Sequence, residues 1–209
     1  FALLPGSILW LSNNTVKKIN HGFVRMIATP LILSLGGITG FLALDNMGDN
    51  LGQYKIDQVL DKAVVTQKDM KADYYGGKTY DIGEFDASIG GITSKAPIAI
   101  FSGIFRPAIW DVKNAVMLVS SLENTYLLIL TVFLLLKLKV LGFFVLIRKN
   151  PMLLFCMLFS LFFAFSVGLT VANFGSLVRL RIPELPFFVA GIFMLRHLYE
   201  KQSGKKVKF

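Results

Sequence analysis

The chain has 209 residues, of which 54% are hydrophobic and 19 are Phe, and its formal net charge is +9. Soluble domains have about 45–50% apolar residues, and the excess here lies in runs of about 20 residues, the length that crosses a bilayer. Because a stretch such as 152–172 has no polar face to show to water, the composition argues against a soluble all-helical domain. It predicts an all-α, polytopic transmembrane helical bundle with one long external loop.

The N-terminal part, residues 1–44, is expected to contain a partial span at 1–11 and a full span at 23–44. Residues 1–11 have no basic region before them and no cleavage motif after them, which argues against a signal peptide. We therefore expect that the chain begins inside a transmembrane helix, as the C-terminal part of a longer protein. The expected partners are membrane lipid and that missing N-terminal part or other membrane subunits.

The external loop is predicted at 45–113 and has three sections. Residues 51–73 place apolar side chains at helical spacing among Asp and Lys, which predicts an amphipathic surface helix. Residues 80–86 are typical of turns and a compact loop. Residues 96–110 are apolar but too short and interrupted to span, so we interpret them as a re-entrant or interfacial element anchored by Trp110.

The C-terminal part, residues 114–209, is expected to cross the membrane at 114–136, 151–172 and 185–195 and to end in a basic cytoplasmic tail. An alternative span at 126–147 would bury two lysines near the bilayer centre, at about 2.5–3.5 kcal/mol each. Ending the span at residue 136 avoids this cost. Residues 140–147 would then lie along the interface or dip into it.

Orientation follows from the distribution of Lys and Arg between the two sides of the membrane. With loops 12–22, 137–150 and 196–209 on the cytoplasmic side and Arg25 directed towards it, that side holds more than half of the Lys and Arg. The rule predicts a bacterial inner-membrane protein with a cytoplasmic C-terminus, and a mirror-image topology in an organelle membrane stays open. Arg179 and Arg181 are then the only basic residues in a short external loop.

Three arginines and one carboxylate near the external membrane surface are the candidate functional residues. Arg106, Arg179 and Arg181 are expected to bind the phosphate of a substrate, because the planar guanidinium donates paired hydrogen bonds to phosphate. Pro183 favours extended backbone before it, in which Arg179 and Arg181 would share one side. The alternatives are contact with lipid headgroups or structural ion pairs.

Glu123 is the candidate catalytic residue, because an intramembrane carboxylate is costly and should face protein or a water-filled cavity. Its alternative is a structural ion pair with one of the three arginines.

In the external loop, Tyr80, Asp81 and Glu84 are candidates for contact with a sugar. Asp81, Glu84 and Asp86 could also bind a divalent cation or supply a catalytic base, although their spacing fits no strong metal motif. A solvated loop is the simpler interpretation of these acids.

Neither a cofactor nor a bound metal is expected. The lone Cys156 lies inside an apolar run, which excludes a disulfide framework and is typical of a small packing residue. The sequence has no P-loop, no dinucleotide glycine pattern, no Ser-His-Asp arrangement and no nucleic-acid module, so no nucleic-acid partner is expected.

The segment 177–191, with its Arg-x-Arg-x-Pro-x-x-Pro pattern, resembles the end of some bacterial multi-spanning proteins of polysaccharide assembly. These are GT-C type glycosyltransferases of lipid-linked sugars and proteins similar to O-antigen polymerases or ligases, and segments 80–86 and 105–111 look like parts of membrane proteins in that setting. The resemblance implies an external active site that uses arginines and acids on a polyprenyl-linked substrate. Such glycosyltransferases usually carry a catalytic acid in the first external loop near their N-terminus, a region that this chain lacks or does not show.

Two functions follow from the sequence. The first is cell-envelope polysaccharide assembly on a polyprenyl-phosphate-linked sugar at the external face, as a membrane glycosyltransferase or polymerase or part of one. The second is a non-catalytic structural or transport-complex membrane subunit, in which Glu123 pairs structurally and the external loop is a docking surface.

Overall fold

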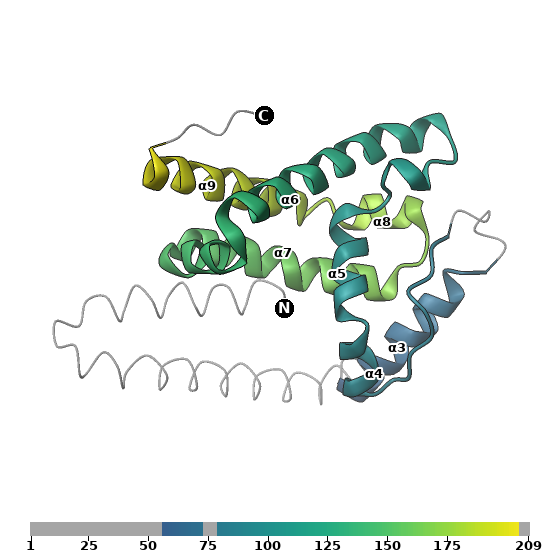
Figure 1. Cartoon of the computed structure of the whole chain (residues 1–209). Coiled ribbons are helices and arrows are strands. Elements are labelled where there is room, and N and C mark those ends of the chain that lie inside the picture. The colour runs from purple at the N-terminus through teal and green to yellow at the C-terminus, as the bar shows by residue number, and fades with distance from the viewer. Residues whose placement is uncertain (1–55, 73–78, 205–209) are drawn as a thin grey trace, which may run out of the picture.

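The computed structural model describes residues 56–72 and 79–204, and the fold of these residues is mostly helical (Figure 1). In chain order the elements are α3 (Ile56–Asp69), α4 (Ile89–Ser94), α5 (Ala96–Phe105), the short 3-10 helix η2 (Ile109–Asp111), α6 (Ala115–Lys149), α7 (Pro151–Thr170), α8 (Phe174–Leu180) and α9 (Leu185–Ser203). No strand occurs within these ranges, which confirms the all-α class. The predicted segments 1–11 and 23–44 lie outside the described residues.

Helices α6 and α7 are long and apolar enough to cross a membrane, by length and composition. Each begins at an asparagine whose side chain caps the first turn. Asn114 Oδ1 accepts from Met117 N at 2.8 Å, and Asn150 Oδ1 accepts from the amides of the first turn of α7. Such caps satisfy amides that have no partner inside the helix. Two hydrophobic segments therefore start where the sequence supplies a polar cap.

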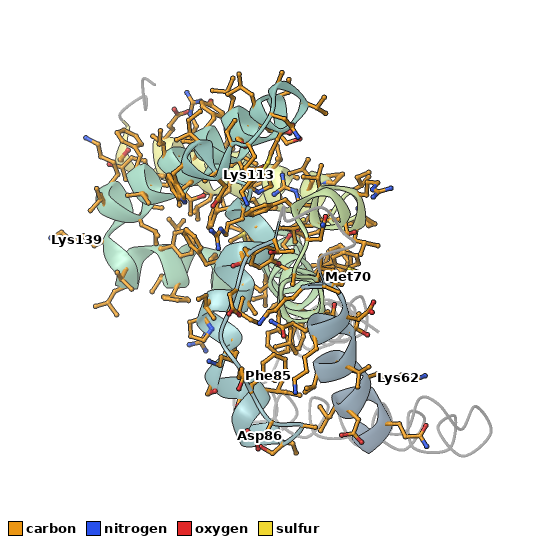
Figure 2. The ribbon with its side chains drawn as sticks, turned by 90° about the vertical axis from the view of Figure 1, so that its right-hand side faces the viewer. Lys62, Met70, Phe85, Asp86, Lys113 and Lys139 are labelled. Atoms are coloured by element: carbon orange, nitrogen blue, oxygen red, sulfur yellow. The ribbon has the colours of Figure 1, made fainter. Side chains whose placement is uncertain are left out.

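A kink at Lys139 divides α6 into two helical pieces. Lys139 has φ 56° and ψ 154°, a conformation outside the helical region, and its side chain points away from the helices in Figure 2. The sequence predicts the end of a span at residue 136, three residues before this kink. The kink separates the apolar run of 115–138 from residues 140–149, whose position relative to a membrane stays a prediction.

Helix α7 is the centre of the described fold, with α5, α9, α6 and α3 packed against it (Figure 1). Its closest neighbour is α5, because glycines face backbone at their crossing. A Cβ added at Gly103 would lie 2.2 Å from the carbonyl oxygen of Ala164, and one at Gly168 would lie 2.0 Å from that of Ala99. Small residues four apart on both helices allow this close backbone approach, as in membrane helix pairs.

Helices α3 and α5 lie in two parts of the predicted external loop, 51–73 and 96–110. The amphipathic helix is observed as α3, which rests on α7 and buries Ala63 and Gln67. The apolar stretch 96–110 contains α5, which has 10 residues and is shorter than a membrane span. Gly103 lies within α5 and allows its close contact with α7.

The outer side of α6 exposes many large apolar side chains. Val116 is 84% exposed and Leu136 is 75% exposed, with Val119, Ile129 and Val132 also exposed between them. A contiguous apolar surface of this kind is uncommon on soluble monomers and marks contact with lipid or another protein.

Candidate functional site

Arg181 lies at the C-terminal end of α8 and is buried, with 3% of its surface exposed. Its guanidinium donates to the carbonyl oxygen of Ile104 at 2.8 Å, to that of Arg106 at 3.3 Å, and to Asn124 Oδ1. The first two oxygens lie at the end of α5, where the last carbonyls of a helix have no helical partner. A cation at a helix C-terminus is also favoured by the helix dipole. Arg181 therefore acts as a distant cap for α5.

Asn124 completes this arrangement from α6. Its side chain is fully buried, accepts from Arg181 and donates from Nδ2 to the carbonyl oxygen of Pro107 at 2.7 Å. Both ends of the amide are therefore hydrogen-bonded, as a buried polar group requires. We name Arg181, Asn124 and the carbonyls of Ile104, Arg106 and Pro107 the arginine clasp, because they join α5, α6 and α8.

Arg106 has a separate, forked contact with Asp111. Its Nε lies 3.0 Å from Asp111 Oδ2 and its Nη2 lies 2.6 Å from Oδ1, the paired geometry typical of arginine and carboxylate. The amide of Ala108 also donates to Asp111 Oδ2 at 3.0 Å. Burial alone would raise the pKa of Asp111, but the hydrogen bonds and charges around it outweigh burial and lower that pKa. Asp111 is therefore held as a carboxylate.

Two aromatic rings cover the other side of Arg106. Its guanidinium carbon lies 5.2 Å from the ring centre of Tyr80 and 5.4 Å from that of Phe174, within cation–π range. Burial raises the pKa of Tyr80, although the charge of Arg106 opposes that rise. Tyr80 N also donates to the carbonyl oxygen of Ala172 at 2.8 Å. Backbone and side-chain contacts of Tyr80 and Arg106 thus hold the segment 79–113 against the link between α7 and α8.

Glu184 is the buried carboxylate next to the clasp. It occupies the N-cap position of α9 without a side-chain capping hydrogen bond, is 1% exposed, and its Oε1 has no hydrogen-bond partner among the described residues. Burial raises its pKa to about 8, against the opposing effect of the Arg181 charge. Burial likewise lowers the pKa of Arg181, and the charges of Glu184 and Glu123 oppose that change. The two groups share a buried environment in which each favours the charged form of the other.

The expectation of an extended stretch before Pro183 is wrong. Residues 174–180 form helix α8, and Arg181 has helical φ and ψ values of −84° and −4°. Residues two apart on a helix point in different directions, so Arg179 and Arg181 separate. Arg179 is exposed and its Nε donates to the carbonyl oxygen of Gly175 at 3.1 Å, whereas Arg181 is buried. Helix α8 ends before Pro183, and residues 181–184 form a turn between α8 and α9.

The remaining predicted site residues differ in their exposure and in their contacts. Glu123 is exposed on α6, beside the clasp residue Asn124 and near enough to Arg181 to affect its pKa. Tyr80 is 5% exposed, which leaves its ring face unavailable to a sugar. Asp81 and Glu84 are exposed, and Asp81 pairs with Lys71 at 2.5 Å. This contact, followed by the amide of Gly83, lowers the pKa of Asp81.

The acids of the segment 79–113 do not gather around one point. Phe85 and Asp86 lie beside α4, far along this segment from Lys113 (Figure 2). Within 56–72 and 79–204, no three His, Cys, Asp or Glu side chains come together as they would around a metal ion.

Sequence reasoning did not assign roles to Asn124, Asp111 and Glu184, the partners of the arginines. Each had a usable signal. Asn124 is a strongly polar residue within an apolar run, and such a residue must find partners when buried. Asp111 follows Arg106 by five residues across a proline turn, and Glu184 follows Arg181 by three.

Comparisons of the chain with models of protein families, with curated proteins and with solved structures found no match.

Proposed function

We propose that the chain is the membrane-embedded part of a polytopic bacterial inner-membrane protein, with α6, α7 and α9 crossing the bilayer. The exposed apolar side of α6 carries this proposal. Side chains such as Val116 and Leu136 are unfavourable in water and favourable in contact with lipid. The two helices of sufficient length and hydropathy support it. The basic residues of 137–150 and 196–209 support a cytoplasmic C-terminus.

Within that setting, the proposed role is structural: the chain is a membrane subunit that holds an external segment in a defined position. Arg106 and Arg181, which the sequence assigns to phosphate binding, direct their guanidinium groups at protein acceptors. A substrate phosphate would have to displace Asp111 from Arg106 or enter the buried clasp. The contacts therefore favour a structural role over a catalytic one. The exposed part of the segment 79–113 is then available for contact with another subunit.

Labelling of introduced cysteines tests the proposed topology. In a Cys156→Ser background, a membrane-impermeant thiol reagent should label Glu84→Cys in intact spheroplasts. The same reagent should label Lys201→Cys only after lysis. Both side chains are exposed in the structure, so reagent access on one side depends on the membrane alone. Labelling of Lys201→Cys in intact spheroplasts, or release of the protein from membranes by alkaline carbonate, would overturn the proposal.

A second candidate is action on a polyprenyl-phosphate-linked sugar in cell-envelope polysaccharide assembly. The exposed guanidinium of Arg179 favours it, because it is the one of the three arginines that a phosphate could reach without breaking a described ion pair or the clasp. Glu123, exposed beside the clasp, would then position a phosphate-bound group or transfer a proton. The resemblance of 177–191 to polysaccharide assembly proteins points in the same direction.

Surface-polysaccharide production separates the two candidates. On the second candidate, Arg179→Ala abolishes the polysaccharide while the protein accumulates normally. Lys201→Ala, an exposed basic residue at the other end of the bundle, is the matched control and should leave polysaccharide unchanged. Normal polysaccharide in Arg179→Ala, together with loss in Arg181→Ala, would support the structural role and exclude phosphate binding at Arg179.

A further inference from the structure

A groove of about 440 Å³ is lined by α9 and by Asn150, the residue before α7. Helices α7 and α9 pack against each other (Figure 1). Its lining is almost entirely apolar and comes from Ala190, Phe193, Met194 and Leu198 of α9, with Asn150 and His197 as its polar members. The volume is within the range of about 300–1,000 Å³ that is typical of small-molecule sites.

The groove has a firm base and an open side. Met194 and Leu198 pack against the main hydrophobic core, which fixes the base, whereas Phe193 is 45% exposed. In water this groove would be hydrated, which is unfavourable because removal of apolar surface from water lowers the free energy. In the membrane setting proposed above, an apolar chain would fill it.

The polar members and the side chains near them are basic or neutral. His197 and Asn150 line the groove, and the exposed Arg148 precedes Asn150 by two residues. Lys201 is exposed one helical turn after His197, on the same side of α9. The nearest acid in sequence, Glu200, is bound to Arg196 at 3.1 Å. The local charge is therefore complementary to an anion.

We propose that this groove binds an anionic phospholipid. One acyl chain lies along Ala190, Phe193 and Met194, and the phosphate faces His197 and Arg148. This inference rests on the proposed membrane location, which puts this end of the bundle at the cytoplasmic surface. Basic pockets between helices at that surface bind anionic headgroups, because a cation near the headgroups gains electrostatic energy that a zwitterionic lipid does not supply.

Native mass spectrometry of the full chain in detergent tests this site, with added phosphatidylglycerol or phosphatidylcholine of the same acyl composition as the probes. We expect retained phosphatidylglycerol adducts and about tenfold weaker retention of phosphatidylcholine, the ratio for one to two favourable charges. Ala190→Trp should fill the groove from an exposed position and remove retention of both lipids. Val116→Trp adds the same ring on the outer side of α6 and should change neither.

A charge variant separates the headgroup from the chain. The double variant Arg148→Ala, His197→Ala should lose the preference for phosphatidylglycerol and keep weak binding of both lipids. Arg179→Ala, at the other end of the bundle, is the control and should keep the preference. Equal retention of the two lipids by the unaltered chain, or equal loss in Ala190→Trp and Val116→Trp, would overturn the proposal. Carbonate extraction of the same membranes reports separately on the proposed location: a protein that stays in the membrane without lipid preference refutes only the groove.

Discussion

Replacement of Arg181 by alanine tests the arginine clasp most directly. The change removes the donor from three acceptors, the carbonyls of Ile104 and Arg106 and the side chain of Asn124. None of these acceptors can easily turn to water, because Arg181 is 3% exposed and Asn124 is fully buried. It also removes the cation nearest to the buried Glu184. The variant therefore leaves several buried polar groups without partners.

The size of the effect follows from these contacts. A hydrogen bond to a charged group contributes about 1.5–3 kcal/mol, but the three bonds share one guanidinium and cannot be added. Removal of one member of a buried charged network costs about 3–5 kcal/mol. For a protein of this size, each kcal/mol shifts the melting temperature by about 2–4 °C. We expect Arg181→Ala to lower the melting temperature in detergent by about 10 °C.

Thermal unfolding followed by Trp fluorescence measures this shift, and Arg179→Ala is its matched control. Arg179 is two residues away and exposed, and its one described hydrogen bond is to the backbone of its own helix. Its replacement should change the free energy of unfolding by less than about 0.5 kcal/mol. Equal melting temperatures for Arg181→Ala and Arg179→Ala would refute the argument that Arg181 fastens α5 to α6.

Two further predictions concern Glu184 and the glycine contact. The pKa of Glu184 is raised to about 8 in the fold. Its contribution to stability is therefore fully present below the ordinary carboxyl pKa and is lost as the pH rises towards about 8. Glu184→Gln, measured by melting temperature from pH 5 to 9, should flatten that decline, and an unchanged profile would show that Glu184 is not its source. Gly168→Val would bring a side chain against the Ala99 carbonyl and should lower the melting temperature by several degrees. Gly142→Ala, whose added Cβ meets only an ordinary contact, should change it little, and similar values for both would contradict the close packing of α5 on α7.

The sequence predicts the helical class, the amphipathic helix and a break in the apolar run near Lys139 from local properties. Periodicity locates α3, and the cost of burying Lys137 and Lys139 indicates a discontinuity close to the one observed. These features depend on neighbouring residues in the chain. They can therefore be predicted without knowledge of what packs against what.

The candidate site could be predicted only as a set of residues near one surface. Arg181 and Ile104 are 77 residues apart in sequence, and nothing local indicates that the guanidinium would meet the end of α5. The proline rule favoured extended backbone before Pro183, but the capped turn at Asn173 and the burial of Phe174 and Leu177 stabilise helix α8 instead. Whether an arginine binds a ligand or the protein itself depends on tertiary contacts that the sequence does not display.

The glycine contact between α5 and α7 has a consequence for synthesis. Helix α5 leaves the ribosome well before Ala164 and Gly168 of α7 exist, and the clasp residue Arg181 is made later still. During that interval α5 has neither its packing partner nor the donor for its last carbonyls. The apolar segment 96–105 can therefore reach its final position only after α7 and α8 have been made. The order of translation makes the packing of α5 a late step in the folding of this region.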